Sequence, residues 1–131
     1  MPDALKDLSL ARIEHAKDCL REAKLLLDNG EYRGAANRSY YAAFHAMRAV
    51  LALNGFDSKK HSGIISKFRE LYIKTGQFTP ELSDAIGSLF NVRSASDYDD
   101  FYVASKADVE LQYQRATKLV SEIASYLAEK S

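Results

Sequence analysis

Residues 31–53 read EYRGAANRSYYAAFHAMRAVLAL and lie between two pairs of helix-breaking residues, Asn29-Gly30 and Asn54-Gly55. Asn and Gly accept the left-handed backbone with which many helices end, so this segment is predicted to be one helix. At 100° per residue its side chains fall on three faces. These are a bulky apolar face (Ala36, Tyr40, Ala43, Met47, Val50, Leu51), a small-residue strip (Ala35, Ser39, Ala42, Ala46, Ala49) and a polar face (Asn37, Arg38, Tyr41, His45, Arg48). Two of the three faces favour burial, so we expect this helix to be central.

The polar face of the central helix has two interpretations. Buried polar groups must be hydrogen-bonded, so these side chains need partners. One interpretation is a structural network with nearby acids such as Asp97, Asp99 and Asp100. The other is a pocket or a subunit interface, in which the same residues contact a ligand or a second chain.

The composition describes one globular domain over residues 1–131. The chain has 18 basic and 18 acidic residues and a formal charge of zero, with only two prolines and six glycines. Few breakers favour helix, and a domain that grips long nucleic acid through its phosphates is usually basic. Any contact with RNA is therefore expected to be local.

The single cysteine, Cys19, excludes an internal disulfide and a cysteine-based zinc cluster, and its helical context predicts a small core residue. No 18-residue apolar run and no signal-peptide core are present, so we expect a cytoplasmic protein without a membrane segment. The acids at 97, 99 and 100 match no loop with known ligand geometry, and no cofactor motif is found. We therefore expect neither metal nor cofactor.

Four further helices are predicted from apolar spacing and end signals. They cover about residues 4 or 9 to 28, 63 to 74, 80 to 92 or 93 (with Phe90 among the inward residues), and 106 to 130. Thr79-Pro80 marks one start, and Ser105 with Asp108 marks another. No alternating segment argues for a strand. The predicted fold is all-α, a single up-down bundle of about five helices.

Three groups of residues outside the polar face carry possible chemistry. Lys60 and His61, after Lys59, form a small cationic cluster at a helix start that suits a phosphate, although such clusters are also common on surfaces. His15 is most simply a solvated surface residue. Tyr98 is either a core aromatic or an exposed hydroxyl open to modification.

Several motifs in this order resemble the prokaryotic HEPN domain, and in particular a branch of small stand-alone proteins. They are Asn37-Arg38-Ser-Tyr40-Tyr41-Ala-Ala-Phe44-His45, Lys60-His61-Ser62-Gly63, Phe68 and Arg93-x-x-x-Asp97-Tyr98-Asp99. The resemblance implies a bundle of about five helices that forms a homodimer. It also implies RNA cleavage without a metal through an Arg-x(4–6)-His motif, and a neighbouring minimal nucleotidyltransferase as toxin–antitoxin partner. In some such pairs that enzyme transfers AMP to a tyrosine near the motif.

Carried to this chain, the motif arginine is Arg93, but residues 97–99 contain no histidine. RNA cleavage needs a group that titrates near neutral pH, and neither Asp nor Tyr ordinarily does. We therefore expect an RNA- or nucleotide-phosphate-binding partner of a minimal nucleotidyltransferase in a toxin–antitoxin-type pair, with weak or absent nuclease activity. The expected binding residues are Arg93, Asn37, Arg38, Tyr41, Lys60 and His61. Asp97 and Tyr98 are motif or modification positions. The alternatives are a metal-free endoribonuclease with Arg93 and His45 as catalytic residues, and a dimeric structural scaffold.

Overall fold

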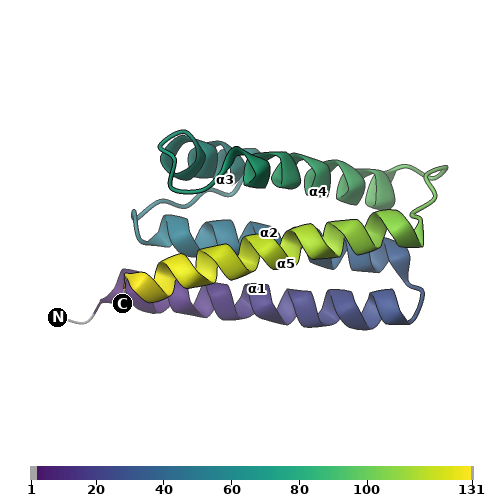
Figure 1. Ribbon diagram of the computed structural model, residues 1–131, viewed down its shortest axis with the longest axis horizontal. Helices are drawn as coiled ribbons and strands as arrows, with labels where there is room; N and C mark the ends of the chain where they lie inside the picture. Colours follow the sequence, from purple (N-terminus) through teal and green to yellow (C-terminus); the bar gives the residue numbers. More distant parts are fainter. Residues whose placement is uncertain (1–2, 131) are drawn as a thin grey trace.

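The computed structural model describes residues 3–130, which fold as an all-α bundle without strands (Figure 1). Its elements are α1 (Ala4–Asp28), α2 (Tyr32–Ala52), α3 (His61–Phe68), the π-helical turn η1 (Arg69–Ile73), α4 (Pro80–Tyr98) and α5 (Lys106–Glu129). The long helices alternate in direction along the chain, with α1 and α4 opposite to α2 and α5. The predicted up-down bundle of about five helices is confirmed.

Helix α2 is central, as its three-face pattern predicts. It packs against α1, α3, α4 and α5, and its contact with α1 is the most extensive. All five residues of the small-residue strip are completely buried, and no residue of the bulky apolar face exceeds 1 % exposure. Small side chains let a neighbouring helix approach closely, whereas Tyr40, Met47 and Leu51 fill the core between the helices.

The ends of the helices follow the local chemistry of the sequence. Gly30, Gly55 and Gly76 have positive φ angles of 75°, 67° and 82°, and each lies just beyond a helical segment. Glycine adopts this backbone without a steric penalty, which explains why the chain turns there. At the start of α5, the Ser105 hydroxyl accepts a hydrogen bond of 3.1 Å from the Asp108 backbone N–H, as predicted.

Two sequence-based expectations for the fourth helix are wrong. Helix α4 does not end at residue 92 or 93 but continues to Tyr98. Arg93 and Asp97 stand one turn apart and pair at 3.0 Å, which stabilises the last turns of a segment too polar to show an apolar repeat. Phe90, expected to face inward, is 37 % exposed.

Cys19 is buried, as expected for a core residue. The helices found within residues 3–130 are either too short or too polar to cross a membrane.

Candidate functional site: an arginine–tyrosine cluster between α2 and α4

Arg93 projects from α4 into a group of aromatic rings. Its Cζ lies 5.5 Å from the ring centroid of Tyr40 and 5.3 Å from those of Tyr41 and Tyr98. Its Nη2 donates to the Tyr41 hydroxyl at 3.0 Å and to the Tyr98 hydroxyl at 3.5 Å. The Arg93 side chain is 13 % exposed, so it is held in place yet still reaches the surface. Cations over aromatic faces are stabilised by the ring quadrupole, more so when partly desolvated.

The carboxylate of Asp97 balances the Arg93 charge and ties α4 to α2. Its Oδ2 lies 3.0 Å from Arg93 Nε and accepts a hydrogen bond of 2.9 Å from Asn37 Nδ2. Asn37 and Tyr41 are one turn apart on α2, so both face the same segment of α4. We call Asn37, Tyr40, Tyr41, Arg93, Asp97 and Tyr98 the Arg93 cluster.

His61, at the start of α3, joins this cluster through Tyr40. Its Nδ1 lies 2.9 Å from the Tyr40 hydroxyl, and its ring lies 4.2 Å from Phe44 and meets Tyr41 edge-on at 5.7 Å. Burial, followed by the charges of Arg93 and Arg48, lowers the pKa of His61 below its ordinary value. Burial also raises the pKa of Tyr40 to about 12. The cluster therefore holds a neutral imidazole and a neutral phenol beside a permanent positive charge.

Two residues of the predicted polar face turn the other way, toward α1. Arg38 Nε lies 3.6 Å from Glu22 Oε1, and the His45 ring stacks on His15 with centroids 3.9 Å apart. Burial, and then the positive charges of His15 and three arginines, lowers the pKa of His45 to about 4. Tyr41 lies between the residues that face α4 and those that face α1. Its ring contacts Arg93 in the first group, and its centroid lies 6.1 Å from that of His45 in the second.

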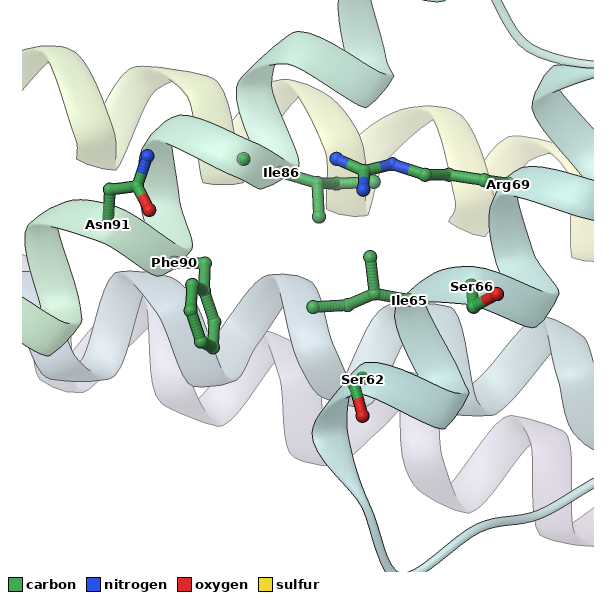
Figure 2. Close-up of a pocket in the computed structure, with 8 residues that line it drawn as sticks. Ser62, Ile65, Ser66, Arg69, Ile86, Phe90 and Asn91 are labelled. Atoms are coloured by element: carbon green, nitrogen blue, oxygen red, sulfur yellow. The ribbon is translucent and has the colours of Figure 1, made fainter.

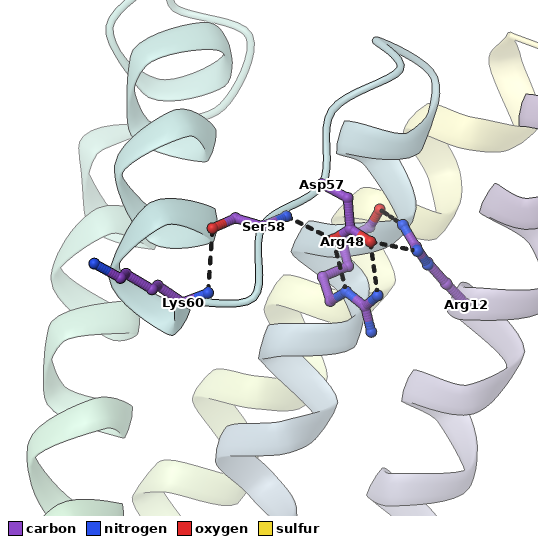
Figure 3. A network of polar contacts seen from close by, with 5 residues as sticks. All are labelled: Arg12, Arg48, Asp57, Ser58 and Lys60. Carbon is purple, nitrogen blue, oxygen red and sulfur yellow. Dashed lines mark hydrogen bonds and ion pairs between the residues drawn. The ribbon is translucent and has the colours of Figure 1, made fainter.

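The remaining polar-face residue, Arg48, anchors the loop before α3 (Figure 3). Asp57 Oδ2 lies 3.1 Å from Arg48 Nη2 and 3.0 Å from Arg12 Nη2, so one carboxylate links this loop to α1 and α2. The Lys60 backbone N–H donates to Ser58 Oγ at 3.2 Å, while its side chain points away from this network. An open hollow of about 640 Å³ lies here and is lined by Phe44, Arg48, Asp57, Ser58, Lys59 and His61. Its lysine is Lys59 and not the expected Lys60.

A second hollow lies between α3 and α4 and was not anticipated from the sequence (Figure 2). It has a volume of about 420 Å³, and Ile65, Ile86 and Phe90 form its apolar wall. The Phe90 ring meets Tyr40 edge-on at 5.8 Å, which places this groove beside the Arg93 cluster. The exposed position of Phe90 is explained by this groove, since the ring lines it instead of filling the core.

Sequence reasoning also missed Arg33, which shapes the segment after α4. Its guanidinium donates to the backbone oxygens of Ser96, Asp99 and Tyr102. Beside this anchor, three apolar side chains face solvent: Tyr98 is 73 %, Phe101 94 % and Val103 83 % exposed. Only the folded chain brings Arg33 to these carbonyls, because more than 60 residues separate them in sequence.

Most of the chain matches a known domain family. The profile of the HEPN domain matches residues 9–129. The chain belongs to the HEPN family. A UPF0332 protein of Thermotoga maritima is 33 % identical over 108 residues, which cover 82 % of each chain. A Methanocaldococcus jannaschii protein named "Putative toxin MJ0142" is 29 % identical over 119 residues, covering 91 % of this HEPN chain and 81 % of that protein.

Solved structures support the same fold. TT1696 from Thermus thermophilus superposes with a TM-score of 0.75 at 20 % identity, covering 89 % of this HEPN chain and 96 % of that one. ST0689, described as an archaeal HEPN homologue, gives a TM-score of 0.72 at 18 % identity over 91 % and 97 % of the two chains. At this level of identity the likeness concerns the fold alone.

Proposed function

We propose that this HEPN chain binds single-stranded RNA or a nucleotide phosphate at the Arg93 cluster, as the partner of a minimal nucleotidyltransferase in a toxin–antitoxin-type pair. The observation that supports this most is the position of Arg93, whose positive charge reaches the surface between tyrosine rings. Guanidinium groups bind phosphates through paired N–H donors, and single-stranded bases stack on aromatic and guanidinium planes. Both chemistries are present within one cluster.

The surroundings of Arg93 favour a nucleotide over a bare anion. The exposed ring of Tyr98 beside the guanidinium offers a stacking surface for a base. Asn37 adds an amide that can exchange its bond to Asp97 for one to a ligand. Because Asp97 already neutralises Arg93 and the chain has no net charge, the contact should be local and only weakly dependent on salt.

The partner part of the proposal is supported by the family and by the names of two relatives from M. jannaschii, which contain the word toxin. We also propose that two copies of the chain form a homodimer. The exposed apolar side chains of Phe101 and Val103 offer a surface for protein contact. Co-expression with the product of an adjacent nucleotidyltransferase gene, followed by co-purification, tests the pairing, and equilibrium sedimentation tests the dimer. A gene without such a neighbour, or failure to co-purify, contradicts the pairing.

Fluorescence anisotropy with a labelled single-stranded RNA tests the binding site. Arg93→Ala removes the phosphate donor and should weaken binding by about tenfold or more, the size expected for a charge-assisted hydrogen bond. Tyr98→Ala should weaken it through lost stacking, worth about 1–3 kcal/mol per base. The matched control is Arg21→Ala, which removes one positive charge from an exposed position on α1. Equal affinities of the Arg93 and Arg21 variants would exclude the Arg93 cluster as the RNA site.

One observation favours a second candidate, the metal-free endoribonuclease. An imidazole does lie beside the arginine, but it belongs to His61, whereas His45 faces α1. The lowered pKa of His61 leaves it neutral near pH 7, as a general base requires. Purified protein in EDTA should then cut RNA, Arg93→Ala and His61→Ala should abolish cutting, and His45→Ala should retain it. Intact RNA after incubation with wild-type protein rejects this candidate, and absence of both binding and cleavage indicates a structural scaffold.

A further inference from the structure

Three metal-ligating side chains meet on the side of α2 that faces α1, outside the Arg93 cluster. His15 and Cys19 are four residues apart on α1 and therefore lie on the same side of that helix. His45 reaches them from α2, and its ring stacks on that of His15. One ligand atom from each residue (Cys19 Sγ and a ring nitrogen of each histidine) lies within 4.8 Å of the other two.

The donors at this position are available for a metal ion. The buried Nδ1 of His45 has no hydrogen-bond partner among residues 3–130, which is unusual because buried ring nitrogens are normally satisfied. Burial, and then the charge of Glu22, raises the pKa of the Cys19 thiol, while Arg38 only partly opposes them, so an incoming metal ion must displace the thiol proton.

We propose that His15, Cys19 and His45 form a binding site for a transition-metal ion of the Zn²⁺ class. Two imidazoles and one thiolate are ligands that Zn²⁺ prefers, and no carboxylate oxygen belongs to this group, which argues against Mg²⁺ and Ca²⁺. With three protein ligands, the fourth position is left for a water molecule, as in other zinc sites of this ligand number. Binding releases the proton of the Cys19 thiol and forms one bond to Sγ and one to each imidazole.

A small movement of His15 completes the site. Zinc bonds of about 2.3 Å to sulfur and 2.0–2.1 Å to nitrogen place tetrahedral ligand atoms roughly 3.3–3.7 Å apart, closer than the separation of up to 4.8 Å found here. The two stacked rings must also turn so that their nitrogens converge. Because the His15 side chain is exposed at the edge of the α1–α2 contact, it can rotate without disturbing the core.

Three arginines near His45 oppose an added positive charge, and carboxylates offset them in part. Arg38 is paired with Glu22, and Arg12 and Arg48 share Asp57. The thiolate supplies a further negative charge at the metal itself. Since the ligands come from both α1 and α2, a bound ion cross-links the two helices that make the largest contact in the bundle. Occupancy should therefore raise the melting temperature.

Titration of the full chain with Co²⁺, a spectroscopic substitute for Zn²⁺, tests the proposal. We expect one ion per chain and a thiolate-to-cobalt charge-transfer absorption, which must come from Cys19 because it is the chain's one cysteine. Added Zn²⁺ should displace the cobalt and remove the absorption. Cys19→Ser should abolish this absorption band. Loss of a residue that only hydrogen-bonds to a metal ligand weakens metal binding roughly 10–100-fold, and His45→Gln and His15→Ala, which remove ligands, should weaken cobalt binding by more than that.

His15→Ala also distinguishes the loss of a metal ligand from misfolding as the cause of weaker cobalt binding, because the exposed side chain can be removed without opening the core. The matched control is His61→Ala, which removes a histidine from outside the site and should leave the cobalt spectrum unchanged. Absence of the charge-transfer band in wild-type protein overturns the proposal, as does equal binding by wild type and the His15 variant. Metal binding that His61→Ala abolishes and His15→Ala spares would assign the ion to another site.

Discussion

The two sides of the polar face of α2 differ in partners and in chemistry. Asn37 and Tyr41 meet Arg93 and Asp97 of α4, where a permanent charge is held among tyrosines. Arg38 and His45 meet Glu22 and His15 of α1. At about 100° per residue, Asn37 and Tyr41 lie about 40° apart, while Arg38 and His45 lie about 80–100° from Asn37. A polar face this wide covers two neighbouring helices, so residues that share a face in sequence need not share a site.

This division separates residues that the sequence groups on one face into two proposed sites. The α4 side combines a cation, aromatic rings and an exposed edge, which suits a nucleotide phosphate and a base. The α1 side combines two imidazoles and a thiol, which suits a metal ion. His45, expected to act with Arg93, belongs to the second group by its contacts, and His61 takes its place beside the arginine.

The largest expected effect comes from breaking the core that supports both sides. Met47 is completely buried on the apolar face of α2. Met47→Ala should lower the free energy of unfolding by about 2–5 kcal/mol, because a cavity is added to the lost burial. Urea denaturation followed by circular dichroism measures this. A loss below about 1 kcal/mol would mean that α2 is not the shared support of the two sides.

The second-largest expected effect is a dependence of folding stability on pH that comes from His45, on the α1 side. The pKa of His45 is about 4 in the folded chain, against about 6.5 in the unfolded chain, so the unfolded state binds the proton more strongly. Its contribution to stability is therefore complete above about pH 6.5 and is lost as the pH falls toward about 4. Because the His45 ring is only half-buried, solvent screening limits its contribution to the free energy of unfolding to about 1–2 kcal/mol.

Thermal unfolding in EDTA between pH 7.5 and 4.5 measures this contribution, with His45→Gln as the test variant. The variant should lose less stability than wild type over that range. The protonated form of His45 is disfavoured by the positive charges of four neighbours, Arg12, Arg38, Arg48 and His15. The size of the pH effect therefore also measures how strongly these charges act on His45. An unchanged pH profile in the variant would contradict this assignment. His61→Gln, on the other side of α2, provides the comparison.

The smallest effect concerns the ion pair of the α4 side. Arg93 and Asp97 have side chains 13 % and 24 % exposed, whereas those of the α1 pair Arg21 and Asp18 are 70 % and 52 % exposed. Double-mutant cycles to alanine should give a coupling of about 1 kcal/mol for the first pair and about 0.2–0.5 kcal/mol for the second. Equal couplings would show that the aromatic enclosure adds nothing to the Arg93–Asp97 pair.

Much of the fold could be predicted because it depends on local chemistry. The 3.6-residue repeat, the Asn-Gly pairs and the serine cap each act within a few residues, so the helices and their buried faces were predictable from spacing. The end of α4 was not predictable in this way, since residues 93–98 lack an apolar repeat and are held by the Arg93–Asp97 pair and by Arg33 from α2. The exposure of Phe90 was missed for a similar reason, because a groove between two helices exists only after they pack.

The sequence by itself determined an all-α bundle with a central α2, and it singled out Arg93 and the polar face as candidates. Only the tertiary structure decided which polar residues meet. It brought Asn37, Tyr41, Asp97 and Tyr98 to Arg93 and added His61, while it left Lys60 pointing elsewhere and turned Arg38 and His45 toward α1. The physical reason is that helix periodicity specifies the direction of a side chain relative to its own axis. The neighbour in that direction depends on how all the helices pack.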